Sequence, residues 1–113
     1  MNFQHKELAE GRWAEMTLAE QMLNIGSEIS RAERWKKKGN MEQCTNAVYR
    51  ALELVYLTIE AQKGKHSLKE FCRLKEVIPD YFLYDNQFNT DGKSLQKYFD
   101  VFAYCRQREV SEK

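Results

Sequence analysis

The side chains that most often carry chemistry, histidine and cysteine, are few in this chain and widely spaced. The histidines are His5 and His66, and the cysteines are Cys44, Cys72 and Cys105. A dinuclear metal site in a helical bundle takes Glu-x-x-His pairs on two helices, and a zinc site takes closely spaced thiols. Neither histidine follows a Glu at that spacing, and no Cys-x-x-Cys occurs. The sequence therefore predicts neither a metal nor another cofactor.

Nucleophilic catalysis needs a nucleophile beside a base. Cys72 with His66 is the only thiol–histidine pair that lies close together in the sequence. We interpret His66 as a surface residue and Cys72 as a small packing residue on the core face of a helix, like the other two cysteines. The five glycines are scattered and mark helix ends, so no loop that cradles phosphate is expected. These patterns predict a protein that is not an enzyme.

Composition and charge narrow the class of protein further. The chain has 113 residues and a net charge of +1, with 42% apolar and 31% charged residues, which fits one globular domain over residues 1–113. The N-terminus is polar and lacks the apolar region of a signal peptide. No span reaches the roughly 20 apolar residues that a bilayer requires. An odd number of widely spaced cysteines indicates reduced thiols, and we expect a cytoplasmic protein with no membrane contact.

One short segment is strongly basic despite the small net charge. Its cations, which are accompanied by a single acid, are Arg31, Arg34, Lys36, Lys37 and Lys38. In the simpler interpretation, they complement the partial negative charge at the C-terminal end of a helix. In the other, they contact RNA phosphates or a protein partner, with Trp35 available for stacking. Because Trp35 falls on the apolar stripe of its helix, we expect it to pack against the core.

A second candidate site is a small-molecule pocket among aromatic residues. Its members would be Tyr49, Arg50, Tyr56, Tyr81 and Tyr98. Arg50 interrupts the most apolar part of a predicted helix. Its guanidinium is therefore expected either to reach solvent or to pair with an acid such as Glu53.

Three helix-start signals define the elements that must position these residues. They are Thr17 with Glu20, Asn40 with Gln43, and Ser67 with Glu70. In each, a short oxygen-bearing side chain precedes Glu or Gln by three residues, which is the spacing of a capping box. Gly39 and Gly64 stand just before the second and third signals, where a helix would end in a left-handed residue. The connections between these helices are therefore short.

Apolar periodicity completes the prediction of an all-α fold. It predicts helices over residues 18–38, 41–63, from 68 through Pro79, and 93–108. The last helix is expected to turn Leu95, Phe99, Phe102 and Ala103 toward the core. Short connections favour an antiparallel up-down-up-down four-helix bundle over residues 17–113, with a kink or a break in the third helix at Pro79. Residues 1–16 form an N-terminal arm that packs on the body or on a second subunit.

The second predicted helix carries a familiar pattern. Gly39-Asn40-Met41-Glu42 leads into the run Ala47 to Glu53, and the helix ends in Gln62-Lys63-Gly64. Over residues 25–82 the chain resembles the HEPN superfamily (higher eukaryotes and prokaryotes nucleotide-binding). Its ribonuclease members carry an Arg followed four to six residues later by His. No His follows Arg73, Arg106 or Arg108. The resemblance therefore implies a non-catalytic relative that forms dimers or accompanies a nucleotidyltransferase.

Two functional hypotheses remain. The first is a non-enzymatic helical bundle that forms a homodimer and contacts a protein partner. The apolar excess on the helix over residues 41–63 and on the arm motivates this hypothesis. The alternative is a HEPN-type protein that binds RNA or a nucleotide through the basic segment at 31–38.

Overall fold

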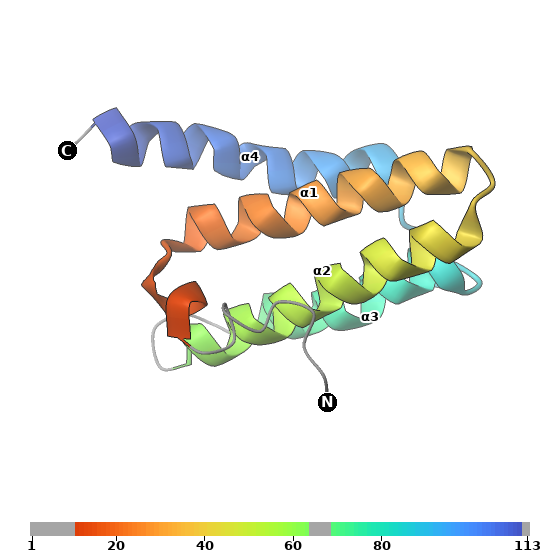
Figure 1. Ribbon diagram of the computed structural model, residues 1–113, viewed down its shortest axis with the longest axis horizontal. Coiled ribbons are helices and arrows are strands. Elements are labelled where there is room, and N and C mark those ends of the chain that lie inside the picture. The colour runs from red at the N-terminus through yellow and green to blue at the C-terminus, as the bar shows by residue number, and fades with distance from the viewer. Residues whose placement is uncertain (1–10, 64–68, 112–113) are drawn as a thin grey trace.

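Four α-helices and one short 3-10 helix make up the computed structural model, which describes residues 11–63 and 69–111. The elements are η2 (Trp13–Glu15), α1 (Leu18–Lys37), α2 (Met41–Ala61), α3 (Lys69–Leu83) and α4 (Gly92–Ser111). No strand occurs within those two ranges. α1 packs mainly against α2 and α4, while α3 packs mainly against α2 (Figure 1). The prediction of an all-helical protein with four packed helices is confirmed.

Local side-chain chemistry fixes where α1 begins and ends. The Thr17 hydroxyl accepts from the backbone N–H of Glu20 at 3.2 Å, and the Glu20 carboxylate accepts from the N–H of Thr17 at 3.2 Å. This reciprocal pair is the predicted capping box. At the other end, Gly39 adopts φ +77°, and the N–H of Asn40 donates to the carbonyl of Trp35 at 3.0 Å. A left-handed glycine thus closes the helix as the sequence predicts.

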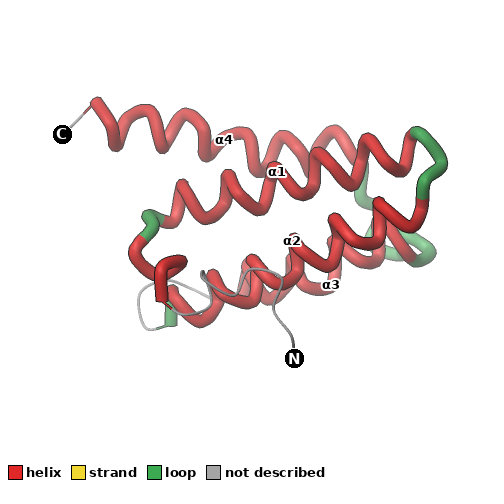
Figure 2. The backbone as a smooth tube through the Cα atoms, in the orientation of Figure 1, coloured by secondary structure: helices red, strands yellow, loops and turns green. Residues whose placement is uncertain are grey.

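The connection from α1 to α2 is short because the same residues end one helix and start the next (Figure 2). The Asn40 side chain accepts from the backbone N–H of Gln43 at 3.2 Å, which caps the start of α2. α2 then presents its buried residues to both neighbouring helices, and Gln62 forms its C-cap. The third predicted cap, Ser67, lies outside the described residues, as do Gly64 and His66.

α3 includes Pro79 and continues to Leu83. The turn that follows is held by Asp80, whose buried carboxylate accepts from the backbone N–H groups of Gln87 at 2.8 Å and Phe88 at 3.1 Å. Asn86 takes a left-handed conformation at φ 51°. Asn tolerates this region better than most residues because its short side chain bonds locally, here to both backbone groups of Thr90.

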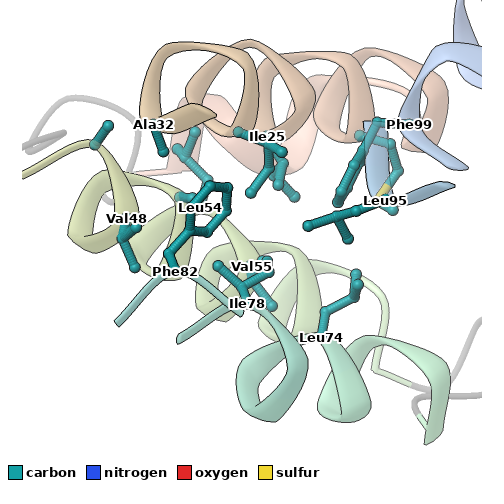
Figure 3. Packing of buried hydrophobic residues seen from close by; sticks show 14 of the residues in the cluster. Ile25, Ala32, Val48, Leu54, Val55, Leu74, Ile78, Phe82, Leu95 and Phe99 are labelled. Atoms are coloured by element: carbon teal, nitrogen blue, oxygen red, sulfur yellow. The ribbon is translucent and has the colours of Figure 1, made fainter. Parts of the chain in front are cut away.

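The core lies where all four helices meet (Figure 3). α1 contributes Ile25 and Ala32 to this cluster and α2 contributes Val48 and Val55, and α3 and α4 close it with Ile78 and Phe99. α4 contributes less than the sequence predicts, since only two of its residues are buried. The expectation that Ala103 faces the core is wrong, because Ala103 is exposed. The C-terminal end of α4 reaches past the start of α1 in Figure 1, and among the described residues the buried side chains of α4 all lie in its first half.

Two glycines allow close packing, and one of them, Gly26, corrects the expectation that glycines only mark helix ends. Gly26 lies in the middle of α1, and a Cβ there would stand 2.8 Å from the Cβ of Phe99. Gly92 begins α4, and a Cβ there would stand 2.3 Å from the Tyr81 hydroxyl. At both sites the missing side chain allows α4 to approach its neighbours closely.

The described part of the N-terminal arm is bound to the bundle through Trp13. This indole is 1% exposed, and its N–H donates to the Thr58 hydroxyl of α2 at 3.0 Å. The Gln21 amide donates to the Trp13 carbonyl at 2.9 Å and accepts from Gln62 at 3.3 Å. Trp13 therefore packs on the body of its own chain, the first of the two placements that the sequence leaves open for the arm.

Candidate functional site

The basic segment divides into cations that contact residues elsewhere in the fold and cations that face outward. Arg31 forms an ion pair with the buried Glu28. The Lys36 ammonium lies 4.0 Å from the centre of the Tyr81 ring and donates to the Tyr81 carbonyl at 3.4 Å. Arg34 is exposed. The exposed members that remain for an external ligand are Arg34, Lys37 and Lys38.

Trp35 is half-buried and packs against the core. The Lys38 ammonium lies 5.2 Å from the centre of its ring. One face of the indole therefore already has a cation beside it. This placement matches the packing role that the sequence predicts for Trp35.

Tertiary packing brings a further lysine to two of the exposed cations. A cleft of about 270 Å³ lies between the C-terminal half of α1 and the start of α4. Its lining residues are Ser30, Glu33, Arg34, Lys37, Gly92, Lys93 and Gln96. Three cations against one acid make the cleft electropositive, which suits an anionic group. Lys93 was not identified from the sequence, because it stands far from the basic segment and no local motif marks it.

The acid in this cleft, Glu33, is engaged by Tyr81 of α3. The Tyr81 hydroxyl lies 3.1 Å and 3.0 Å from the two carboxylate oxygens. Burial, together with this hydrogen bond and the charge of Glu33, raises the pKa of Tyr81 to about 12. A phenol that stays protonated keeps donating to the carboxylate. Glu33 is thus oriented toward α3, while the cations of the cleft remain exposed.

Arg50 pairs with an acid, the second of the two placements that the sequence leaves open, and this acid lies on another helix. Its Nε donates to the Glu28 carboxylate of α1 at 2.7 Å. Glu28 is 4% exposed and also binds Arg31, so one buried carboxylate holds two guanidinium groups. Pairing a buried charge with hydrogen-bonded partners is what makes its burial tolerable. No local spacing signals this pair, because Glu28 and Arg50 lie on different helices.

The four tyrosines of the candidate pocket occupy different environments. Tyr49 and Tyr56 are exposed on α2. Tyr81 donates to Glu33, as described above, and Tyr98 donates to Glu70 of α3 at 2.8 Å. Burial and the bond to Glu70 raise the pKa of Tyr98. None of the four tyrosines lines the cleft between α1 and α4, nor an open cleft on α3 that includes Cys72.

The cysteines differ from one another more than the sequence predicts. Cys44 is fully buried, and burial raises the pKa of its thiol. Cys72 and Cys105 are exposed, so the expectation that they are packing residues is wrong. Cys72 lines an open cleft of about 560 Å³ on α3. Its side chain points away from the core because the buried face of α3 is set by Phe71, Leu74 and their successors at helical spacing.

Within residues 11–63 and 69–111, no group of three His, Cys, Asp or Glu side chains is placed to hold a metal ion. Over the same residues, no helix combines the length and the apolar content needed to cross a membrane. Comparison with models of protein families, with curated proteins and with solved structures finds no match for this chain.

Proposed function

We propose that this chain is a non-enzymatic helical-bundle protein that pairs with a second copy of itself and contacts a protein partner. The observation that carries the proposal is the outward face of α2. Tyr49 and Tyr56 leave 52% and 43% of their surface exposed there. Tyrosines favour protein interfaces because they bury a large area while ordering few torsions. α2 is therefore apolar enough to form the core on one side and to offer an interface on the other.

A second exposed surface supports a separate protein partner. Val101 and Tyr104, three residues apart on α4, leave 57% and 65% of their surface exposed. Residues at this spacing share one face of a helix. This face lies in the part of α4 that packs least in the described structure.

Light scattering over a concentration series tests the self-association. The molar mass should rise from that of one chain toward twice that value as the protein reaches high micromolar concentration. Tyr49→Ser with Tyr56→Ser should shift the chain toward the monomer. Tyr84→Ser is the matched control, because Tyr84 is 73% exposed but lies beyond α3. A strictly monomeric wild-type chain at high micromolar concentration would refute the proposal.

The proposal also covers the direction of the helices, the shape of α3 and the cellular location of the protein. We take the helices to alternate in direction, up-down-up-down, and α3 to bend at Pro79. The short connection between Lys37 and Met41 supports the first, and the missing proline N–H supports the second. We place the protein in the cytoplasm, since its cysteines are free thiols.

The electropositive cleft favours a second candidate function, the binding of RNA by a HEPN-type protein that accompanies a nucleotidyltransferase. Arg34 and Lys37 of α1 meet Lys93 of α4 around this cleft. Cations from two helices around one concave surface suit a phosphate group better than a single row of lysines does. Because the catalytic Arg–His pair is missing, the candidate function is binding and not cleavage.

Fluorescence anisotropy with a single-stranded RNA at two salt concentrations tests this candidate. Three phosphate contacts predict a loss of affinity of roughly 20-fold between about 50 and 200 mM salt. Lys93→Gln should weaken binding and reduce the salt dependence. Lys75→Gln, which removes an exposed lysine outside the cleft, should change little. Absence of binding at low salt would eliminate the candidate.

A further inference from the structure

The outward face of α2 carries two tyrosines that lie symmetrically about the middle of the helix, with an acid near one end and a base just past the other. Exposed or half-buried residues recur along it at spacings of three and four, except for Leu52 and Glu53, which are adjacent at its centre. They are Glu42, Thr45, Tyr49, Leu52, Glu53, Tyr56 and Glu60, and Lys63 follows three residues later in the turn just past the end of α2. Such spacing forms one continuous seam on a helix. The two tyrosines are equally far from the midpoint between Leu52 and Glu53, and so are Glu42 and Lys63.

A two-fold axis through that midpoint gives the two tyrosines and the two charged ends of the seam complementary mates, while Leu52 lies opposite Glu53 and Thr45 opposite Glu60. Tyr49 lies opposite Tyr56 of the partner subunit, and the reverse contact repeats on the other side of the axis. Glu42 lies opposite Lys63 of the partner subunit, again twice. A two-fold interface uses the same surface on both subunits, so it requires this kind of self-complementarity.

We propose that two copies pair through α2 in antiparallel orientation, with the two-fold axis between Leu52 and Glu53. The inference rests on the proposed self-association and specifies its geometry. Charge selects the orientation, because a parallel pairing in register would set Glu42 against Glu42 and Lys63 against Lys63. Like charges held opposite each other oppose association, whereas the antiparallel pairing puts an acid opposite a base at both ends.

The tyrosines and Leu52 supply most of the affinity, while the charged ends fix the register. The end pairs are exposed, since Glu42 and Lys63 both face solvent in the single chain. Exposed ion pairs contribute little free energy. Lys63 already contacts Glu60 of its own chain at 3.0 Å, so in the dimer its ammonium would lie between two carboxylates. Aromatic pairs at the centre are the groups that commonly dominate an interface.

Disulfide trapping distinguishes the two orientations. The exposed thiols are first removed by Cys72→Ser and Cys105→Ser. In the antiparallel pair, Tyr49→Cys chains mixed with Tyr56→Cys chains should form a cross-linked heterodimer on mild oxidation. Tyr49→Cys chains without the other variant should not cross-link. In the antiparallel pair, residue 49 of one copy and residue 49 of the other are seven residues apart, or about 10 Å along the helix axis. Cα atoms in a disulfide lie only about 4.4–6.8 Å apart.

A charge exchange provides an independent readout. Glu42→Lys alone and Lys63→Glu alone should each weaken association severalfold, and the double variant should restore it. In a parallel pair the double variant would leave like charges opposite each other.

The outcomes separate the inference from the proposal on which it rests. Cross-linking of Tyr49→Cys chains with themselves would overturn the antiparallel geometry. A wild-type dimer by light scattering with no cross-link in any mixture, or with no rescue by the charge exchange, would reject pairing through α2 but leave self-association standing. A wild-type monomer at high micromolar concentration would reject both. Circular dichroism of each variant confirms that the helices are retained.

Discussion

Replacing Thr58 by valine should destabilise the fold, although the two side chains have nearly the same shape. The Thr58 hydroxyl accepts the indole N–H of Trp13 at 3.0 Å, and both residues are almost fully buried. In the variant the indole N–H has no acceptor at that position. A buried donor left without a partner costs about 1–3 kcal/mol, which is more than the small gain from an added methyl group.

A double-mutant cycle isolates this hydrogen bond from the packing around it. Trp13→Phe removes the N–H donor together with part of the ring, so it loses both the bond and some buried area. When Thr58→Val is added to Trp13→Phe, no donor is left unpaired, and the second substitution should cost much less than it does in the wild type. We expect a coupling energy of about 1–3 kcal/mol, close to the full cost of the unpaired donor.

Urea unfolding followed by far-ultraviolet circular dichroism measures all four proteins. A loss of about 2 kcal/mol lowers the urea midpoint by roughly 1 M for a chain of this size. The protein concentration must be held fixed, because self-association would stabilise the folded state by mass action. Trp35 remains in every variant as a second probe of unfolding.

Two results would refute the reasoning. If Thr58→Val unfolds at the wild-type urea concentration, the Trp13 indole does not depend on that hydroxyl. If the two substitutions add without coupling, their effects come from packing alone. Either result would also weaken the conclusion that the arm is bound to the body of its own chain.

Gly26→Ala should lower the free energy of unfolding, measured with urea, by about 1 kcal/mol. The added Cβ would stand 2.8 Å from the Cβ of Phe99, and this crowding outweighs the helix propensity that alanine usually adds. Tyr81, with its pKa raised by burial and a carboxylate hydrogen bond, keeps its proton in the folded state up to pH about 12, whereas the unfolded chain loses it near 10. Stability should therefore fall as the pH rises across this window, and Tyr81→Phe should reduce the fall measured in urea. Glu28→Gln should lower the free energy of unfolding by about 1–3 kcal/mol in the same assay, because Arg50 loses a charged partner.

Matched substitutions check that these effects come from the named contacts. Ser27→Ala, at the exposed position after Gly26, should be neutral or slightly stabilising. Glu60→Gln breaks an exposed pair with Lys63 and should cost less than 1 kcal/mol. A Glu28→Gln variant no less stable than Glu60→Gln would contradict the role given to the buried carboxylate. Unchanged pH dependence in Tyr81→Phe would contradict the assignment of that phenol.

Local chemistry in the sequence was enough to predict the helices. Thr17 and Asn40 cap α1 and α2 because each supplies an oxygen to backbone N–H groups within three residues. Gly39 ends α1 because it adopts a positive φ at no steric cost. These interactions depend on neighbours in the chain, so spacing alone reveals them. The apolar stripes of α1 and α2 were predictable for the same reason, since helical periodicity places each residue on a known face.

The candidate sites depend on contacts between different helices, and the spacing of residues along the sequence does not predict such contacts. Lys93 joins Arg34 only because α4 packs along α1. Glu28 meets Arg50 across α1 and α2, and Cys72 is exposed because neighbouring residues take the buried face of α3. The sequence by itself determined which segments are helical and where they start, because those interactions are local. Only the tertiary structure decided which charges meet and which tyrosines remain exposed, because both follow from how the helices pack.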